Sequence, residues 1–117
     1  METRNPDTYA LWADFWQALS HPIRLRVLTA LRQARELNVG QLVDRLGIGQ
    51  GHLSNHLACL KNCGLVTTVP QGRYVYYRIA DDRVPALLDL GEAIFHDHWV
   101  GVATCAMVNP PTVLSQP

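Results

Sequence analysis

The sequence predicts a mainly α-helical domain with one β-hairpin, an α+β fold, from three patterns. Apolar residues recur at spacings of three and four along most of the chain, which is typical of amphipathic helices. Two short helical segments are separated by "GIG", and a glycine-containing turn between short helices is the pattern of a helix-turn-helix. Two β-prone runs follow at once, so the order of elements is that of a winged helix-turn-helix.

The length and composition favour one folded domain. The chain has 117 residues, of which 48% are apolar and 17% are charged, as in ordinary globular proteins. We expect the domain to span 1–108 and the proline-rich end "NPPTVLSQP", 109–117, to be a flexible tail. Neither a signal peptide nor a run of about 20 apolar residues is evident, so we expect a cytoplasmic protein with reduced cysteines.

Apolar periods and capping residues predict the individual elements. Helices are predicted over 7–19, from Pro22 after the polar cap in "SHP", over 39–46, over 50–62 and from Asp82. Strands are predicted at Val66–Val69 and Tyr74–Ile79, because both runs are rich in β-branched or aromatic residues. The intervening "PQG" predicts the turn of a hairpin.

The first predicted helix carries a heavy apolar stripe. Its members recur at helical spacing and are Leu11, Trp12, Phe15, Trp16 and Leu19. The last predicted helix has a similar apolar side, formed by Val84, Leu87, Leu88, Ile94 and Phe95. Such a stripe either fills the core of its own chain or contacts a second copy, and the sequence leaves both alternatives open.

The charges are unevenly distributed, although the net charge is zero. Residues 20 to 80 contain eight Lys or Arg and two acidic residues, a net charge of +6. The segments 1–19 and 81–117 carry −2 and −4. Binding to phosphates needs a local positive field rather than a positive total, so the middle of the chain is suited to nucleic acid. Ordinary solvated helix faces would give the same pattern.

Three stretches together resemble the ArsR/SmtB family of bacterial metal-sensing repressors. They are "ALSHPIRLRVLTAL", "QLVDRLGIGQGHLSNHLACLKNCGLV" and "GRYVYYRI", and the resemblance covers roughly residues 8 to 100. The family implies a homodimer, joined through its first and last helices, that represses transcription from a palindromic DNA operator. It implies no enzyme, and no nucleophile–base pair, phosphate loop or carboxylate pair stands out in the sequence.

Polar side chains at the start of the predicted helix 50–62 are candidates for reading bases. Such a helix enters the major groove with its first turns, where Asn and Gln pair with adenine and Ser suits any base. Arg73, at the predicted hairpin tip, is placed for a phosphate or the minor groove. The predicted DNA-binding residues are Gln50, His52, Ser54, Asn55, His56 and Arg73.

Two cysteines, Cys59 and Cys63, lie four residues apart at the end of the predicted helix 50–62, where Cys63 directly follows the last helical residue. This spacing brings side chains onto one face with Cβ atoms roughly 5–6 Å apart, so both thiolates can reach one metal ion. A buried cysteine is also a good small apolar residue, so ordinary packing is the alternative. The third cysteine, Cys105, favours a metal site because three sulfurs suit a soft heavy ion.

The family resemblance also indicates which of its metal sites are missing. The arsenic-sensing branch has two cysteines in a stretch that here reads "ELNVGQL", with Asn38 and Gly40 in their places. The zinc-sensing branch has ligands where Arg83 and Ile94 stand here, and neither residue binds zinc.

The remaining pattern is that of the cadmium- and lead-sensing branch. There, two cysteines of the recognition helix meet a third from the C-terminal region of the other subunit. The resemblance thus implies a site formed by Cys59, Cys63 and Cys105 of the partner subunit. Cd(II) or Pb(II) is the favoured inducer, whereas Hg(II) or As(III) would also accept three sulfurs.

The predicted function is a repressor whose metal-free dimer binds the operator and whose metal-bound dimer releases it. Two alternatives stay open. In a thiol redox sensor, oxidation of one of these cysteines would shift the same helix. The disulfide would then form between subunits, because a pair at this helical spacing makes a strained bond. A winged-helix dimer without an inducer would use the cysteines only for packing.

Overall fold

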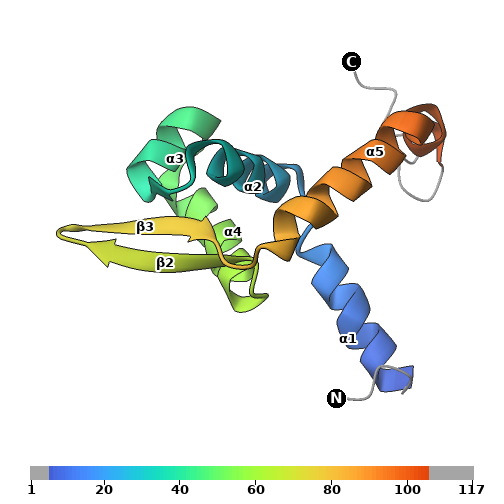
Figure 1. The fold of residues 1–117 in the computed structure, drawn as a ribbon, viewed down its shortest axis with the longest axis horizontal. Helices are drawn as coiled ribbons and strands as arrows, with labels where there is room; N and C mark the ends of the chain where they lie inside the picture. The colour runs from blue at the N-terminus through green and yellow to red at the C-terminus, as the bar shows by residue number, and fades with distance from the viewer. Residues whose placement is uncertain (1–5, 106–117) are drawn as a thin grey trace. The chain divides into compact units, whose positions relative to one another are not determined.

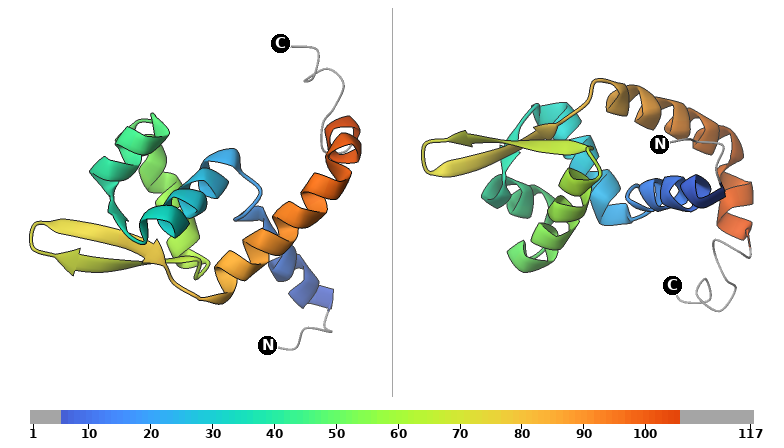
Figure 2. Two further views of the ribbon diagram at one scale, coloured as in Figure 1. Left: turned by 45° about the horizontal axis from the view of Figure 1, so that its top comes forward. Right: turned by 90° about the horizontal axis from the view of Figure 1, so that it is seen from below.

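The computed structural model describes residues 6–105, and the contacts among them define two units (Figures 1 and 2). The first unit ends at Asp82 and holds helices α1 to α4 with a small sheet, and the second begins at Arg83 with helix α5. The predicted α+β class and the winged helix-turn-helix order are confirmed. The predicted tail, 109–117, lies outside the described residues, so the domain boundary at 108 stays a prediction.

The four helices of the first unit agree closely with the sequence periods. They are α1 (Pro6–Gln17), α2 (Pro22–Ala34), α3 (Val39–Leu46) and α4 (Gln50–Asn62). The predicted bounds of α3 and α4 are confirmed, but α1 ends two residues before the predicted Leu19. Here the N–H groups of Ala18 and Leu19 donate to carbonyls three residues back, at 3.0 Å, which tightens the chain into a turn.

Local side chains begin and end these helices. His21 caps α2, because its Nδ1 accepts from the backbone N–H of Ile23 at 3.1 Å, and Pro22 occupies the first helical position. Asn38 and Gln41 form a reciprocal capping box at the start of α3. Gly47 ends α3 with a φ of 68°, a left-handed conformation that favours glycine and lets α4 start in a new direction.

The sheet contains one strand more than predicted. Its strands are β1 (Leu37–Asn38), β2 (Val66–Gln71) and β3 (Tyr74–Ile79), all antiparallel in the order β1–β3–β2. The two-residue β1 is too short to show a period of its own, and only its pairing with Tyr76 and Tyr77 makes it a strand.

The hairpin turn lies further along the chain than the predicted "PQG". Pro70 and Gln71 belong to β2, where they pair with Val75 and Tyr74, and the loop is Gly72–Arg73. Proline fits here because β2 is an edge strand. Gly72 has a φ of 64°, as the first position of a tight two-residue hairpin loop often requires.

The core of the first unit is formed mainly by leucines of three helices. Its fully buried side chains are Val27, Leu28, Leu31, Leu42, Leu53, Leu57, Leu60 and Val66. Helix α4 contributes Leu53, Leu57 and Leu60, which recur at helical spacing and lie on one face. This face packs against α2 and α3, so the opposite face of α4 is left to solvent.

The aromatic stripe of α1 does not fill the core of its own chain. Trp12 is 52% exposed and Tyr9 and Trp16 are also exposed, although the three rings pair along the helix. Burying such side chains would be strongly favourable, so the surface of α1 is typical of a protein–protein interface.

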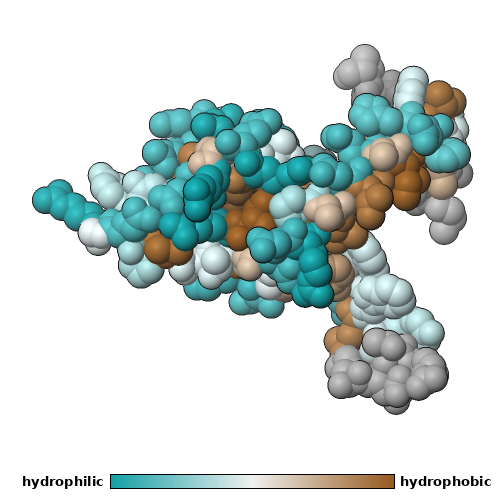
Figure 3. Space-filling model, viewed as in Figure 1, coloured by the Kyte–Doolittle hydropathy of each residue, from teal (hydrophilic) through white to brown (hydrophobic). Residues whose placement is uncertain are grey.

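Helix α5 (Arg83–Thr104) shows a similar apolar surface (Figure 3). Val84 is buried, but Leu90, Ile94, Phe95 and Trp99 are exposed, and Ile94 reaches 63%. A kink at His98, with φ −134° and ψ 17°, divides the helix near its end. Over the described residues, no helix is long and apolar enough to cross a membrane.

One carboxylate connects all three strands of the sheet. Glu36, directly before β1, accepts from Nε and Nη2 of Arg78 in β3 at 2.9 and 2.7 Å, and from Nε2 of Gln71 in β2 at 3.0 Å. These hydrogen bonds, with that from Arg78 contributing most, hold the pKa of Glu36 below its ordinary value. The carboxylate thus stabilises the folded sheet only while it is ionised.

We expect Glu36→Gln to lower stability at neutral pH and to have little effect in acid. Because folding lowers the pKa of Glu36, its contribution is present above about pH 4.3, the ordinary value, and is lost as the pH falls through the folded-state value. Urea unfolding of wild type and variant between pH 7 and about pH 3 measures the difference. Glu92→Gln, an exposed glutamate of α5, is the matched control. A difference that stays constant with pH would contradict the role of Glu36.

Candidate functional site

Helix α4 presents the predicted base-reading residues on its solvent side. Gln50, His52, Ser54 and Asn55 are all exposed, because the leucines between them face the core. The Ser54 hydroxyl donates to the Gln50 carbonyl at 2.8 Å, which occupies its proton within the helix and leaves its oxygen as an acceptor. Gln50 and Asn55 therefore offer free amide groups of the kind that pair with adenine.

His56 is placed differently from the other predicted DNA-binding residues. It is half-buried, and its ring lies 4.3 Å from that of His21 and 5.1 Å from that of His52, between ring centroids. Its Nδ1 accepts a hydrogen bond from Nε of Arg24 in α2, at 3.1 Å. Burial, followed by the charges of His21 and Arg24, lowers the pKa of His56, so the ring is neutral at neutral pH.

Arg73 occupies the loop of the β2–β3 hairpin. The loop is exposed and lies at the end of the hairpin away from the rest of the first unit (Figure 1). A guanidinium in this position can reach a phosphate beside a groove occupied by α4. It stays a predicted contact, as do the five residues of α4.

Cys59 lies in the last turn of α4, and Cys63 caps the C-terminal end of this helix. Cys59 and Cys63 are both free and half-buried, and the backbone N–H of Cys63 donates to the carbonyl of Cys59 at 3.1 Å. Burial is the main cause that raises the pKa of the Cys63 thiol, and Cys59 adds to it, while the charge of Arg24 opposes both. Burial therefore favours the protonated form of the Cys63 thiol in this structure.

The third predicted ligand, Cys105, follows α5 in the second unit and is half-buried. Among residues 6–105 of one chain, no group of three or more His, Cys, Asp or Glu side chains is arranged to hold a metal. The described chain thus supplies an adjacent pair of donors from α4. A third sulfur from Cys105 of a second subunit stays a prediction.

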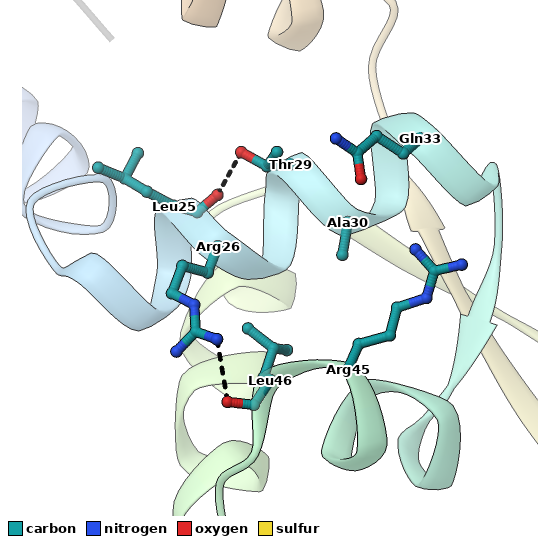
Figure 4. Close-up of a pocket in the computed structure, with 7 residues that line it drawn as sticks. All are labelled: Leu25, Arg26, Thr29, Ala30, Gln33, Arg45 and Leu46. Atoms are coloured by element: carbon teal, nitrogen blue, oxygen red, sulfur yellow. Dashed lines mark hydrogen bonds between the residues drawn. The ribbon is translucent and has the colours of Figure 1, made fainter.

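An open cavity of about 460 Å³ lies between α2 and α3 (Figure 4). Arg26 and Arg45 stand on either side of it, and Arg26 donates to the carbonyl of Leu46 at 3.0 Å. Its lining residues are Leu25, Arg26, Thr29, Ala30, Gln33, Arg45 and Leu46. None of these is a predicted ligand or DNA contact.

Arg24 is the residue at this site that sequence reasoning missed. In the sequence it is one of eight basic residues between 20 and 80, and in the structure its guanidinium donates a hydrogen bond to His56. Its position three residues after the helix cap His21 is the only signal in the sequence, and it does not reveal a contact with α4, which begins 26 residues later.

These elements form a winged helix-turn-helix, the fold of a DNA-binding domain. A family described as "Bacterial regulatory protein, arsR family" matches residues 21–68, which include α2, α3 and α4. The chain belongs to this ArsR family. The resemblance seen in the sequence is therefore confirmed.

Two relatives illustrate the similarity. The "HTH-type transcriptional regulator CmtR" of Mycobacterium bovis is 42% identical over 62% of this chain and 60% of its own length. The chain therefore spans less than two thirds of the CmtR regulators that it matches. The "Probable mercury resistance operon repressor" of Streptomyces lividans is 32% identical, over 89% of this chain and 80% of its own length.

A solved structure agrees with the fold over nearly its whole length. The homodimeric winged helix-turn-helix DNA-binding domain Mb0332 of Mycobacterium bovis has a TM-score of 0.71 and 30% sequence identity. The match covers 85% of this chain and 94% of the solved domain.

We expect iodoacetamide to modify Cys63 slowly at pH 8 in the folded, metal-free protein. The thiolate is the reactive species, and a raised pKa keeps this thiol protonated above the ordinary value of about 8.5. Mass spectrometry of the alkylated peptides, at a series of pH values, gives the rate for this cysteine. The same cysteine in urea-unfolded protein is the control, and an equal pH midpoint in both states would contradict the burial argument.

Proposed function

We propose that the protein is a metal-responsive transcriptional repressor that binds an operator as a homodimer and releases it when a soft heavy-metal ion binds. The observation that carries this proposal is the placement of Cys59 and Cys63 four residues apart at the C-terminal end of α4, the helix that also presents the predicted base-reading side chains. A ligand held by this pair necessarily acts on the DNA-reading element itself. A protein that binds chromosomal DNA in a bacterium works in the cytoplasm.

The polar face of α4 supports DNA binding. Gln50, Asn55 and His52 are exposed on the second helix of the helix-turn-helix, the one that enters the major groove in this motif. Arg73 on the hairpin adds a positive charge for the phosphate backbone. Together they provide both base-reading and phosphate-binding groups, as sequence-specific recognition requires.

The exposed apolar residues of α1 and α5 support a homodimer. Trp12 and Trp16 on α1, and Ile94 and Trp99 on α5, are large side chains that a second copy of the chain would cover. The homodimeric structure of the similar Mycobacterium bovis domain supports the same assembly. A two-fold dimer places two copies of α4 about one helical turn of DNA apart, so the operator would be palindromic.

Two donors from one chain and one from the other would form the metal site. Cys59 and Cys63 are adjacent in this structure, and we assign the third position to Cys105 of the partner subunit. Three thiolates without a fourth donor suit Pb(II), Hg(II) and As(III), and Cd(II) would accept one more ligand. Cd(II) or Pb(II) is favoured by the similarity to CmtR, and Hg(II) by that to the mercury repressor.

The charge that metal binding brings to α4 would explain why the metal-bound protein releases DNA. Bound to three thiolates, a divalent ion leaves about one negative charge in place of three neutral thiols. Cys59 and Cys63 then bring this charge to the helix that faces phosphates, where repulsion opposes binding. A coupling of about 1–3 kcal/mol would weaken operator binding roughly 5- to 150-fold.

Cadmium titration of the reduced protein and of three single Cys→Ser variants tests the proposal. We expect metal–thiolate absorbance in the ultraviolet for wild type, together with an operator affinity that falls roughly 5- to 150-fold. Each of Cys59→Ser, Cys63→Ser and Cys105→Ser should keep the metal-free affinity and lose most of this change. If Cys105→Ser responds like wild type, the third ligand is wrong, and if wild type does not respond, the metal response is wrong. Release by peroxide alone, with crosslinked subunits on a non-reducing gel, would indicate a redox sensor instead.

Two substitutions separate base reading from phosphate binding. We expect Asn55→Ala to reduce discrimination between operator and altered sequences by about 1–3 kcal/mol. Arg73→Ala should weaken binding to all sequences alike and reduce the salt dependence by about one charge. Fluorescence anisotropy at several salt concentrations measures both, and Arg32→Ala in α2 is the control for removal of one positive charge. Loss of sequence discrimination in Arg73→Ala would contradict this division of roles.

A further inference from the structure

We propose that the open cavity between α2 and α3 is a binding site for a small organic anion, namely a carboxylate that carries an apolar body. The cavity lies within the first unit, and none of the cysteines or predicted DNA-reading residues lines it. This inference therefore goes beyond the proposed function and does not depend on it.

One side of α2 and the last turn of α3 form the walls of this cavity (Figure 4). The α2 side chains in its lining are Leu25, Arg26, Thr29, Ala30 and Gln33. Because neighbours in this set are three or four residues apart, they lie together on one side of the helix. Helix α3 contributes Arg45 and Leu46. The volume of about 460 Å³ lies within the range of small-molecule sites, which is about 300–1,000 Å³.

The inner part of the cavity is apolar. Ala30 and Leu46 are only 8% and 6% exposed, whereas Leu25 is 42% exposed, so apolar surface continues from the interior to the opening. The hydroxyl of Thr29 donates to the carbonyl of Leu25 at 2.8 Å, so its proton is used within α2. A ligand with an apolar body would remove this surface from water, which is favourable in proportion to the area covered.

Two guanidinium groups lie on opposite sides of this apolar surface (Figure 4). That of Arg26 is held in place, because its Nη2 donates to the carbonyl of Leu46 at 3.0 Å. The guanidinium of Arg45 makes no hydrogen bond or ion pair with any residue between 6 and 105, and this includes Asp44, its neighbour in α3. No acidic side chain belongs to the lining, so the wall of the cavity holds two positive charges and no counter-charge.

This combination determines the chemical class of the ligand. A carboxylate accepts two parallel hydrogen bonds from one guanidinium, and such charge-assisted bonds are stronger than neutral ones. Arg45 offers a free guanidinium of this kind, and Arg26 keeps nitrogen atoms that Leu46 does not use. The apolar residues between the two arginines favour a hydrophobic body over a small hydrated anion. A small aromatic or branched aliphatic carboxylate therefore suits both parts of the site.

Benzoate is a probe of this class, and the full-length, reduced, metal-free protein is the form to test. We expect saturable changes in the NMR signals of backbone amides at the cavity, such as those of Thr29, Gln33 and Leu46, with a Kd of about 1 mM. Benzyl alcohol has the ring without the charge, and acetate has the charge without the ring. Both should bind at least about tenfold more weakly than benzoate. Benzoate without saturable changes at these amides would overturn the proposal.

Two variants that each lose one positive charge separate the cavity from general electrostatic attraction. Arg45→Gln removes the unpaired guanidinium and should weaken benzoate binding at least about tenfold. Lys61→Gln removes an exposed charge of α4 outside the cavity and should bind benzoate as the wild type does. Both side chains are exposed, and thermal unfolding verifies that both variants are folded. Equal benzoate binding by the two variants, whether strong or weak, would overturn the role of Arg45.

Inorganic phosphate separates an organic ligand from a simple anion. It offers charge and acceptors but no apolar body, so at equal ionic strength we expect it to bind at least about tenfold more weakly than benzoate. Equal or tighter binding of phosphate would show that the two arginines accept any anion, including a phosphate of DNA, and would overturn the assignment to an organic carboxylate. The proposed metal response is independent of both results, because these titrations contain no metal.

Discussion

The structure depends on the burial of one face of α4. Leu53, Leu57 and Leu60 are at most 1% exposed, and their spacing commits that face to the core formed with α2 and α3. Because a helix advances 100° per residue, this commitment also determines where every other side chain of α4 lies. Gln50 and Asn55 are directed to solvent, whereas His56, Cys59 and Cys63 lie at the boundary between core and solvent. Most of the predicted DNA-reading groups and the proposed metal-binding groups thus belong to one helix and its C-terminal end but differ in their burial.

The boundary position explains the chemical state of these groups. Partial burial disfavours charge, so the Cys63 thiol is held protonated and the His56 imidazole neutral, while α2 supplies Arg24, whose guanidinium donates a hydrogen bond to His56. Full burial would hinder entry of a ligand, and full exposure would screen the charges.

A homodimer would account for two features of the single chain, its exposed apolar helices and its pair of cysteines. Helices α1 and α5 expose large apolar side chains, and residues 6–105 of one chain gather two sulfurs but no third metal donor. A second copy would cover the first and supply the second. The energy of dimerisation, which comes mainly from burying apolar surface, would then also assemble the ligand site. Metal affinity and subunit association would be linked, as in any site shared between chains.

The sequence by itself determined the elements whose physics is local. The periods of α3 and α4, the cap before α2 and the strand-forming runs all depend on neighbours a few residues away, as does the i, i+4 spacing of Cys59 and Cys63. Tertiary structure decided what distant segments do to each other. Strand β1 exists only through its pairing with β3, Pro70 joins a strand only because β2 lies at an edge, and Arg24 meets His56 across 32 residues of sequence. Such contacts are set by how helices and strands pack, and no local pattern encodes them.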